Sequence, residues 1–257
     1  MKNKLYLIFL LTSTSLLSYS QDKTGIEKDL LKLFHRIEYW SENPQVNYDS
    51  LGKANQDFMH ALLGYTDKYA FTIRESFPSL LQEGLLIATA PDNKLRIYSW
   101  DTGLGGTMRD FSAVYQYRQG DKTYSGRVPG ATPEEEPQDF YSHIYQLEGN
   151  QRTYYIAICH AIYSTKDAYQ GVKIFSIENG QLNSEVKLIK TSTGIRNELG
   201  FAFDFFSVVD RPERPVKLIN YDPSTKTITI PVVHEDGRVT KKWIKYRFNG
   251  QYFEKNK

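Results

Sequence analysis

Cys159 and His160 are adjacent residues whose types suggest a nucleophile and a general base. They lie in the run YYIAICHAIY, residues 154–163, whose composition and alternation predict a strand. Because adjacent side chains of a strand point to opposite faces, the two cannot form a catalytic dyad there. We expect His160 to be a hydrogen-bonded core histidine and Cys159 a small buried residue. A different histidine, His143 or His234, would have to serve the thiol.

Two carboxylates offer a second kind of chemistry. Asp204 interrupts the apolar run FAFDFFSVV, residues 201–209, which predicts a strand buried on both faces. A buried carboxylate must be paired or protonated, so Asp204 either bonds a loop backbone or an arginine such as Arg196, or has a raised pKa in a cleft. Together with Asp101 it would make a carboxylate pair for glycoside hydrolysis. The catalytic candidates of such a hydrolase are Asp101, Asp204, His143 and His160.

The glycine-rich stretch LRIYSWDTGLGGT, residues 95–107, raises the question of a phosphate-binding loop. No Lys-Ser or Lys-Thr follows the glycines, and no helix opens after them, so neither a P-loop nor a dinucleotide fingerprint is present. A tight turn, with Asp101 bonding backbone N–H groups, explains the glycines. In the preceding strand Arg96, Tyr98 and Trp100 share one face. Exposed, they would form an aromatic and cationic binding surface; buried, they would pack between a sheet and helices.

A similar alternation closes the chain. Ile244, Tyr246 and Phe248 alternate with Trp243, Lys245 and Arg247, so one face goes to a core and the other is aromatic and basic. A surface Trp flanked by cations suits a protein or glycan partner, although Lys and Arg also guard sheet edges. The binding candidates are therefore Arg96, Tyr98, Trp100, Trp243 and Arg247.

Metal and cofactor motifs are lacking. The five histidines (His35, His60, His143, His160 and His234) show neither HExxH nor paired spacing, and no EF-hand pattern of Asp appears. We predict no metal and no cofactor. Cys159 is the only cysteine, so no internal disulfide can form.

These residues must be positioned by two kinds of element. Residues 25–40 have apolar side chains at helical spacing, which predicts a helix. A second helix is expected over residues 49–63, with Gly64 as its stop, and a short helical turn over residues 76–82. From Leu85 the apolar period changes to two.

The β-rich part is divided by turn signals, among which Asn-Gly and Asp-Gly are strong indicators of hairpins. These signals are PDN at 91–93, QGDK at 119–122, EGNQ at 148–151, ENGQ at 178–181, DPSTK at 222–226, EDG at 235–237 and NG at 249–250. Their spacing predicts an α+β fold: a helical region over residues 21–84, then an antiparallel β-meander domain over residues 85–257. The meander is expected to be sandwich-like or partial-propeller-like, since residues 217–255 have the rhythm of one propeller blade.

Residues 1–20 read as a signal peptide. Lys2 and Lys4 form a basic start, residues 5–11 a short apolar run, and Ser18 and Ser20 a cleavage site before Gln21. The alternative is an uncleaved anchor helix, for which the apolar run is short. No Cys lies near the cleavage site, so we expect an exported protein, periplasmic or secreted, that is neither a lipoprotein nor membrane-spanning after cleavage.

The net charge of the chain excludes one class of partner. Cleavage would remove two Lys and no acidic residue, so the formal charge would fall from +2 to 0. A general nucleic-acid binder needs a basic field, so no nucleic-acid partner is expected.

Three stretches carry a resemblance to a group of proteins. They are NYDSLGKANQDFMHALLGYT (47–66), KLRIYSWDTGLGGTMRDF (94–111) and YDPSTKTITIPVVHEDGRVTKKWIKYRFNGQYF (221–253). In these, and in a signal peptide ending in Ser-Gln, the chain resembles uncharacterised exported proteins of the Bacteroidetes type. The resemblance implies export and a layout of helices followed by β-strands. It brings no known activity and no catalytic residues.

The sequence favours a non-catalytic binding module for a protein, peptide or glycan, because it is rich in aromatic residues, with 19 Tyr and 14 Phe, and carries no catalytic motif. One alternative is a secreted hydrolase whose carboxylates and histidines meet only in the fold. The other is a structural subunit of an envelope assembly.

Overall fold

The computed structural model describes residues 23–43, 47–128, 139–150 and 152–256. The predicted signal peptide, residues 1–20, lies outside them. Within the described part, no helix is both long enough and apolar enough to cross a membrane.

The helices precede the strands, as predicted. Residues 23–42 are helical, and α2 (Tyr48–Lys68) follows, capped by the Asn47 side chain, which accepts a hydrogen bond from Ser50 N at 3.1 Å. The prediction that Gly64 ends the second helix is wrong, because the helix continues one more turn to bury Thr66. Two short helices, η1 (Ala70–Arg74) and α3 (Pro78–Gln82), lead into the first strand.

The strands form three sheets. The first sheet has the order β1-β2-β3-β4 and comprises β1 (Leu86–Thr89), β2 (Leu95–Asp101), β3 (Phe111–Gln119) and β4 (Lys122–Arg127). The second sheet has the order β11-β7-β6-β5, with β8 paired to β7. It comprises β5 (Phe140–Glu148), β6 (Thr153–Ile162), β7 (Asp167–Glu178), β8 (Gln181–Asn183) and β11 (Glu198–Asp204).

The third sheet has the order β10-β9-β15-β14-β13-β12. It comprises β9 (Ile189–Thr191), β10 (Gly194–Arg196), β12 (Asn220–Asp222), β13 (Thr227–Val233), β14 (Val239–Phe248) and β15 (Phe253–Lys255). β15 pairs with β9 in parallel, whereas the neighbouring pairs in all three sheets are antiparallel.

The turn signals read from the sequence fall where the hairpins are. Each of the seven separates two strands that pair antiparallel: β1–β2, β3–β4, β5–β6, β7–β8, β12–β13, β13–β14 and β14–β15. At the β7–β8 turn, Asn179 and Gly180 have φ of 50° and 75°. Asn and Gly tolerate this left-handed backbone, which a two-residue hairpin requires at both positions.

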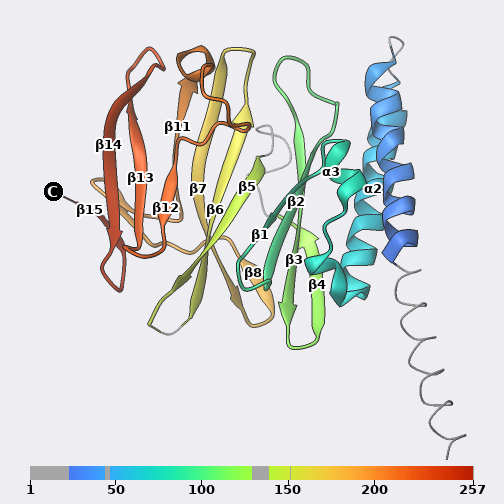
Figure 1. Cartoon of the computed structure of the whole chain (residues 1–257), viewed down its shortest axis with the longest axis horizontal. Helices are drawn as coiled ribbons and strands as arrows, with labels where there is room; N and C mark the ends of the chain where they lie inside the picture. Colours follow the sequence, from blue (N-terminus) through green and yellow to red (C-terminus); the bar gives the residue numbers. More distant parts are fainter. Residues whose placement is uncertain (1–22, 44–46, 129–138, 151, 257) are drawn as a thin grey trace, which may run out of the picture.

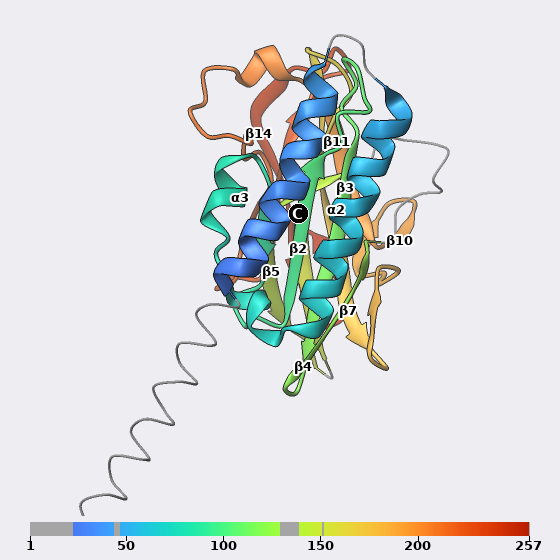
Figure 2. The same cartoon turned by 90° about the vertical axis from the view of Figure 1, so that its right-hand side faces the viewer.

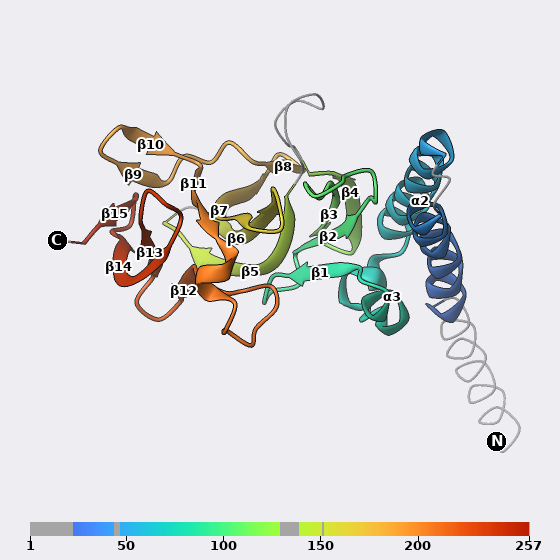
Figure 3. The same ribbon diagram turned by 90° about the horizontal axis from the view of Figure 1, so that it is seen from above.

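The molecule is layered, with the helices on one side and the three sheets stacked behind them (Figures 1 and 2). Seen from above in Figure 3, the helices, the first sheet, the second sheet and the third sheet succeed one another. Three apolar cores fill the spaces between these layers. The fold is therefore α+β with face-to-face sheets, closer to a sandwich than to a propeller.

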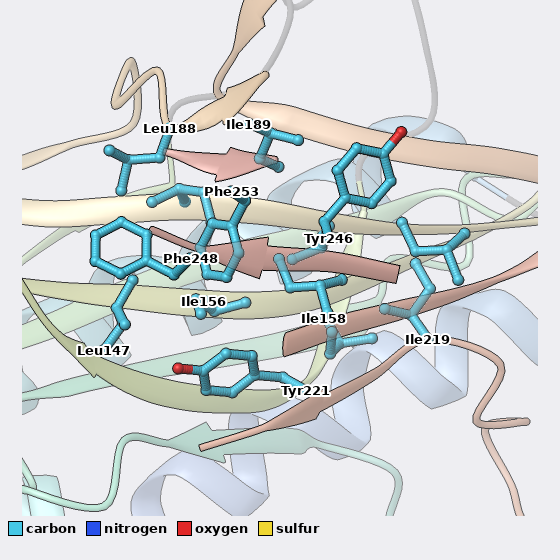
Figure 4. Packing of buried hydrophobic residues seen from close by; sticks show 14 of the residues in the cluster. Leu147, Ile156, Ile158, Leu188, Ile189, Ile219, Tyr221, Tyr246, Phe248 and Phe253 are labelled. Atoms are coloured by element: carbon cyan, nitrogen blue, oxygen red, sulfur yellow. The ribbon is translucent and has the colours of Figure 1, made fainter. Parts of the chain in front are cut away.

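The core between the second and third sheets shows how the layers are held (Figure 4). Ile156 and Ile158 of β6 pack there with Phe248 and Phe253 of the third sheet. Burying one such side chain contributes roughly 1.5–3 kcal/mol. The alternate residues of β6, including Cys159, enter the core against the first sheet, so this strand is buried on both faces.

The expected buried strand over residues 201–209 is shorter than predicted. β11 ends at Asp204, and η2 (Phe205–Val208) follows. Phe206 is 56% exposed, so the apolar run does not stay in the core. The physical reason is local: the Asp204 side chain accepts a hydrogen bond from Phe206 N at 2.9 Å and thereby caps the helical turn.

Candidate functional site

The outward face of β14 carries an exposed row of one aromatic and three basic side chains. Trp243, Lys245 and Arg247 alternate with Ile244, Tyr246 and Phe248, which turn to the core, as the closing sequence pattern predicts. Lys241 and Lys242, which precede Trp243, are exposed as well. Trp243 is 44% exposed, whereas Tyr246 and Phe248 are buried. We call Lys241, Trp243, Lys245 and Arg247, with Pro231 and Thr229 of the adjacent strand β13, the Trp243 face. It lies on the outermost sheet, at the far end of the stack from the helices (Figure 1).

The register of the third sheet fixes the position of the indole. Trp243 stands directly opposite Pro231, and Lys245 stands opposite Thr229. Directly opposed residues in an antiparallel pair have Cβ atoms about 4.5–5.5 Å apart, so the Pro231 ring limits the positions open to the indole. The face therefore presents an exposed indole beside a proline of the neighbouring strand.

The charges of the Trp243 face are not neutralised by neighbouring acids. Lys241, Lys245 and Arg247 form no ion pair with any residue that the structure describes. Glu254 is opposite Arg247 in the sheet register, but its carboxylate is 2.7 Å from Lys190 Nζ instead. That pairing lowers the pKa of Glu254 and raises the pKa of Lys190. The row therefore remains free to meet an anionic partner.

The other aromatic stripe, predicted as a binding candidate, is interior. Arg96, Tyr98 and Trp100 are all buried between the first sheet and the helices. Trp100 Nε1 donates to Asn55 Oδ1 at 2.9 Å, and burial raises the pKa of Tyr98 to about 12. The Arg96 guanidinium donates to the carbonyl oxygens of Thr72 and Glu75. The stripe thus fixes the helical layer on the sheet, which is the packing alternative, and offers no surface to a partner.

The two candidate carboxylates, Asp101 and Asp204, stabilise local turns of the backbone. Asp101 accepts from Gly103 N at 2.9 Å and pairs with Arg109 at 3.1 Å, as expected for a residue that closes the glycine-rich turn. Asp204 caps η2 and lies 3.6 Å from Lys166 Nζ rather than beside an arginine. Neither carboxylate is hydrogen-bonded to a histidine within the described ranges. They belong to different sheets, and no hydrogen bond joins the two carboxylates within the part of the chain that the structure describes.

The two candidate histidines are joined through a residue that the sequence did not single out. A β-bulge between Tyr141 and His143 leaves Ser142 without a partner in the register of β6. Ser142 Oγ lies 2.7 Å from His160 Nε2 and 3.2 Å from His143 Nδ1. A Ser and a His at this distance could act as a nucleophile and its base. They can do so only if the Ser hydroxyl donates the hydrogen bond and the His nitrogen accepts it.

Gln170 fixes the direction of this hydrogen bond. Its Oε1 accepts from the backbone N–H groups of Leu218 and Ile219, so its Nε2 must be the atom that faces Val216 O and His160 Nδ1. The ring nitrogen Nδ1 of His160 therefore accepts, and Nε2–H donates to Ser142 Oγ. A catalytic base needs the opposite arrangement.

The protonation of His160 agrees with a structural role. Burial, with a smaller contribution from His143, lowers the pKa of His160 to about 3. The imidazole is therefore neutral near pH 7 and a poor acceptor of a proton. The predicted role of His160 as a hydrogen-bonded core residue is confirmed. Gln170, which contacts His160, also bonds Val216, Leu218 and Ile219 in the segment that connects the second sheet to the third.

Cys159 sits in a charged cluster that the sequence did not reveal. Lys173 Nζ lies 2.6 Å from Asp139 and 3.5 Å from Glu198, and the Cys159 thiol is hydrogen-bonded to Asp139. Tyr169 OH donates to Glu198 at 2.5 Å. Burial raises the pKa of the thiol well above its usual range, so Cys159 is a buried neutral group, as expected.

The cluster was missed because its members are separated by long stretches of chain. The sequence feature that could have predicted the cluster is Lys173, a charged residue inside the apolar run of β7. A buried ammonium must be paired, so carboxylates were to be expected beside it. The oxygen and sulfur atoms of Asp139, Cys159 and Glu198 lie close enough to hold a cation. In this fold the cation beside the carboxylates is the Lys173 ammonium.

Another hollow, of about 920 Å³, lies between the β9–β10 hairpin, β11 and β15. Several of its polar side chains are already paired: Lys190 with Glu254, and Arg196 with Thr193. It therefore offers fewer free groups than the Trp243 face.

Of the residues selected from the sequence, the structure brings Trp243 and Arg247 together on one exposed face and links His143 to His160 through Ser142. It places Arg96, Tyr98 and Trp100 in the interior. No model of a known protein family matches the chain, and no curated protein matches it with significant similarity.

Proposed function

We propose that this chain is a non-catalytic binding module that recognises an acidic segment of a partner protein or peptide through the Trp243 face. The observation that carries the proposal is the exposed indole in a row of cations that form no ion pair with the described residues. Trp and Arg are enriched at the energetically important positions of protein interfaces.

The spacing of the row favours an extended peptide. Residues two apart on a strand are separated by about 6.8 Å. Acidic side chains at alternate positions of an extended ligand repeat at the same distance, so they can meet Lys245 and Arg247 while the ligand residue next to them lies over the indole of Trp243.

Catalysis receives less support from the fold. The hydrolase alternative needs Asp101 or Asp204 beside His143 or His160. His160 lines one hollow and Asp101 another, and the hydrogen that His160 shares with Ser142 is on the imidazole. These positions support the non-catalytic binding module over the hydrolase alternative.

Export belongs to the same proposal. Its support is the basic start, short apolar run and small residues of positions 1–20. Expression of the full chain in a Gram-negative host, with cell fractionation and N-terminal sequencing, tests it. We expect mature protein outside the inner membrane, beginning at Gln21; full-length protein in the cytoplasm would contradict export.

Binding is tested with a fluorescein-labelled poly-L-glutamate 20-mer, followed by fluorescence anisotropy. We expect binding that weakens as salt is added. The double substitution K245E/R247E is expected to lower affinity at least tenfold, which corresponds to about 1.4 kcal/mol. W243A is expected to lower it several-fold, because the indole supplies apolar contact that salt does not screen.

Matched controls separate the face from net charge. K28E/K32E makes the same change of charge on exposed residues of the N-terminal helix, and Y48A removes an exposed aromatic on α2. Both should bind as the unmodified chain does. Equal loss of affinity in K28E/K32E, or binding of heparin in place of poly-L-glutamate, would overturn the proposal.

A further inference from the structure

A second candidate site shares no lining residue with the Trp243 face. A cleft of about 490 Å³ opens where the first and second sheets meet the segment that follows β11. Its volume is within the roughly 300–1,000 Å³ typical of small-molecule sites. Most of its lining is apolar, and the residues used below are Phe140, His160, Ala168, Phe203, Phe205 and Arg214.

The wall of the cleft is aromatic even at His160. This ring stacks on Phe140, with centroids 4.8 Å apart and an interplanar angle of 11°. Both of its nitrogens already have partners, Gln170 and Ser142, and burial keeps it neutral. A ligand therefore meets an uncharged ring there. The interior of the cleft is suited to hydrocarbon.

Arg214 supplies the charge. Its guanidinium lies over the Phe205 ring at 5.3 Å from the centroid. Three of its N–H groups donate to the carbonyl oxygens of Val209, Arg211 and Glu213, which hold the fork in place.

Two donors of Arg214 remain. The Nε–H and one Nη2–H have no partner among the described residues, and the guanidinium forms no ion pair there. Asp210 and Glu213 belong to the same segment, but neither lines the cleft. Planar carboxylates are the groups that a guanidinium binds with two parallel hydrogen bonds.

We propose that this cleft binds a small apolar carboxylate, with its hydrocarbon part against Phe140, His160 and Phe203 and its carboxylate on Arg214. The occupant is a free monomeric acid rather than a lipid surface, because the apolar space is one cleft of about 490 Å³ whose lining includes a single cation, Arg214. The inference does not depend on the Trp243 face, since the two sites share no residue.

Isothermal titration with decanoate at pH 7.5, below the concentration at which it forms micelles, is the test, and 1-decanol is the uncharged comparison. We expect decanoate to bind at least tenfold more tightly than decanol. R214Q should remove that difference by weakening decanoate alone. R211Q, which removes a cation of the same segment that does not line the cleft, should bind both compounds as before.

Two further variants locate the apolar part. A168F places a ring in the cleft and should abolish binding of both compounds. F205A removes a half-buried wall residue and the ring beneath the guanidinium, so it should weaken both even if A168F fails to fold. F206A, at the next position but exposed, is the matched control.

The outcomes decide the proposal. Equal affinity for decanoate and decanol, full binding by R214Q, or equal loss in F206A would overturn it. Binding of the protein to phosphatidylglycerol vesicles without binding of monomeric decanoate would overturn it as well, in favour of a lipid surface. Because K245E/R247E leaves this cleft intact, it should not change decanoate binding, so failure of either proposal can be told from failure of the other.

Discussion

Cys159 and His160 are neighbours in the chain, yet they lie on opposite faces of β6 and belong to different networks. Cys159 faces the first sheet and bonds Asp139, whereas His160 bonds Ser142 and Gln170. The two side chains are separated because successive side chains of a strand point to opposite faces. The adjacent Cys and His therefore do not form a nucleophile–base pair. Each has a separate structural role.

The buried thiol should be unreactive in the folded protein. Because the thiolate is the reactive form and burial raises the pKa of Cys159, reaction with DTNB at pH 8 should be far slower than that of a free thiol. Unfolding in guanidinium chloride should restore the ordinary rate. Stoichiometric labelling of the native protein within seconds would show that the site opens.

Gln170 should matter to stability more than its polar side chain suggests. Q170L leaves the N–H groups of Leu218 and Ile219 and the carbonyl of Val216 without partners in a buried place. Each unsatisfied group costs about 1–3 kcal/mol, so we expect a loss of about 3–5 kcal/mol in urea unfolding. Q181L, at an exposed position of β8, should change stability by less than about 0.5 kcal/mol. Similar losses in both variants would refute the role of this network.

Stability should fall as the pH falls below about 6.5. The folded-state pKa of His160 is lowered to about 3 from an ordinary 6.5, so between these values the unfolded chain binds one more proton than the folded chain. The slope from this group is about 1.4 kcal/mol per pH unit, and its contribution is fully present above pH 6.5.

The pH effect can be assigned by comparing variants between pH 7 and pH 5. His143, which reaches the same network through Ser142, also has a lowered pKa and acts in the same direction. H160Q should therefore reduce the slope of unfolding free energy against pH without removing all of it. H60Q, on the exposed side of α2, should keep the slope of the unmodified protein; an unchanged slope in H160Q would contradict the assignment.

The two tryptophans named from the sequence should behave differently. W100A removes a fully buried ring that packs edge-to-face on Phe58 and leaves Asn55 Oδ1 without its donor, so a loss of about 3–5 kcal/mol is expected. W243A should cost less than about 1 kcal/mol, because the indole is 44% exposed. Thermal unfolding followed by circular dichroism measures both. Comparable losses would mean that Trp243 is part of the core.

What the sequence determined by itself is local. Spacing of apolar residues predicted the two N-terminal helices, and Asn-Gly, Asp-Gly and similar turns placed the hairpins, because backbone geometry at these positions depends on a few adjacent residues. The same alternation correctly assigned Trp243 to an outward face and separated Cys159 from His160. The end of β11 was missed, because the Asp204 cap competes with an apolar run that reads as strand.

Tertiary structure alone decided which faces meet. Alternation says that Arg96, Tyr98 and Trp100 share a face, but only the stacking of helices on the first sheet buries that face while the equivalent face of β14 stays outermost. The Lys173 cluster and the cleft beside Arg214 join residues from strands and loops far apart in the chain. Their contacts depend on how whole layers pack, and no short-range pattern encodes the order of those layers.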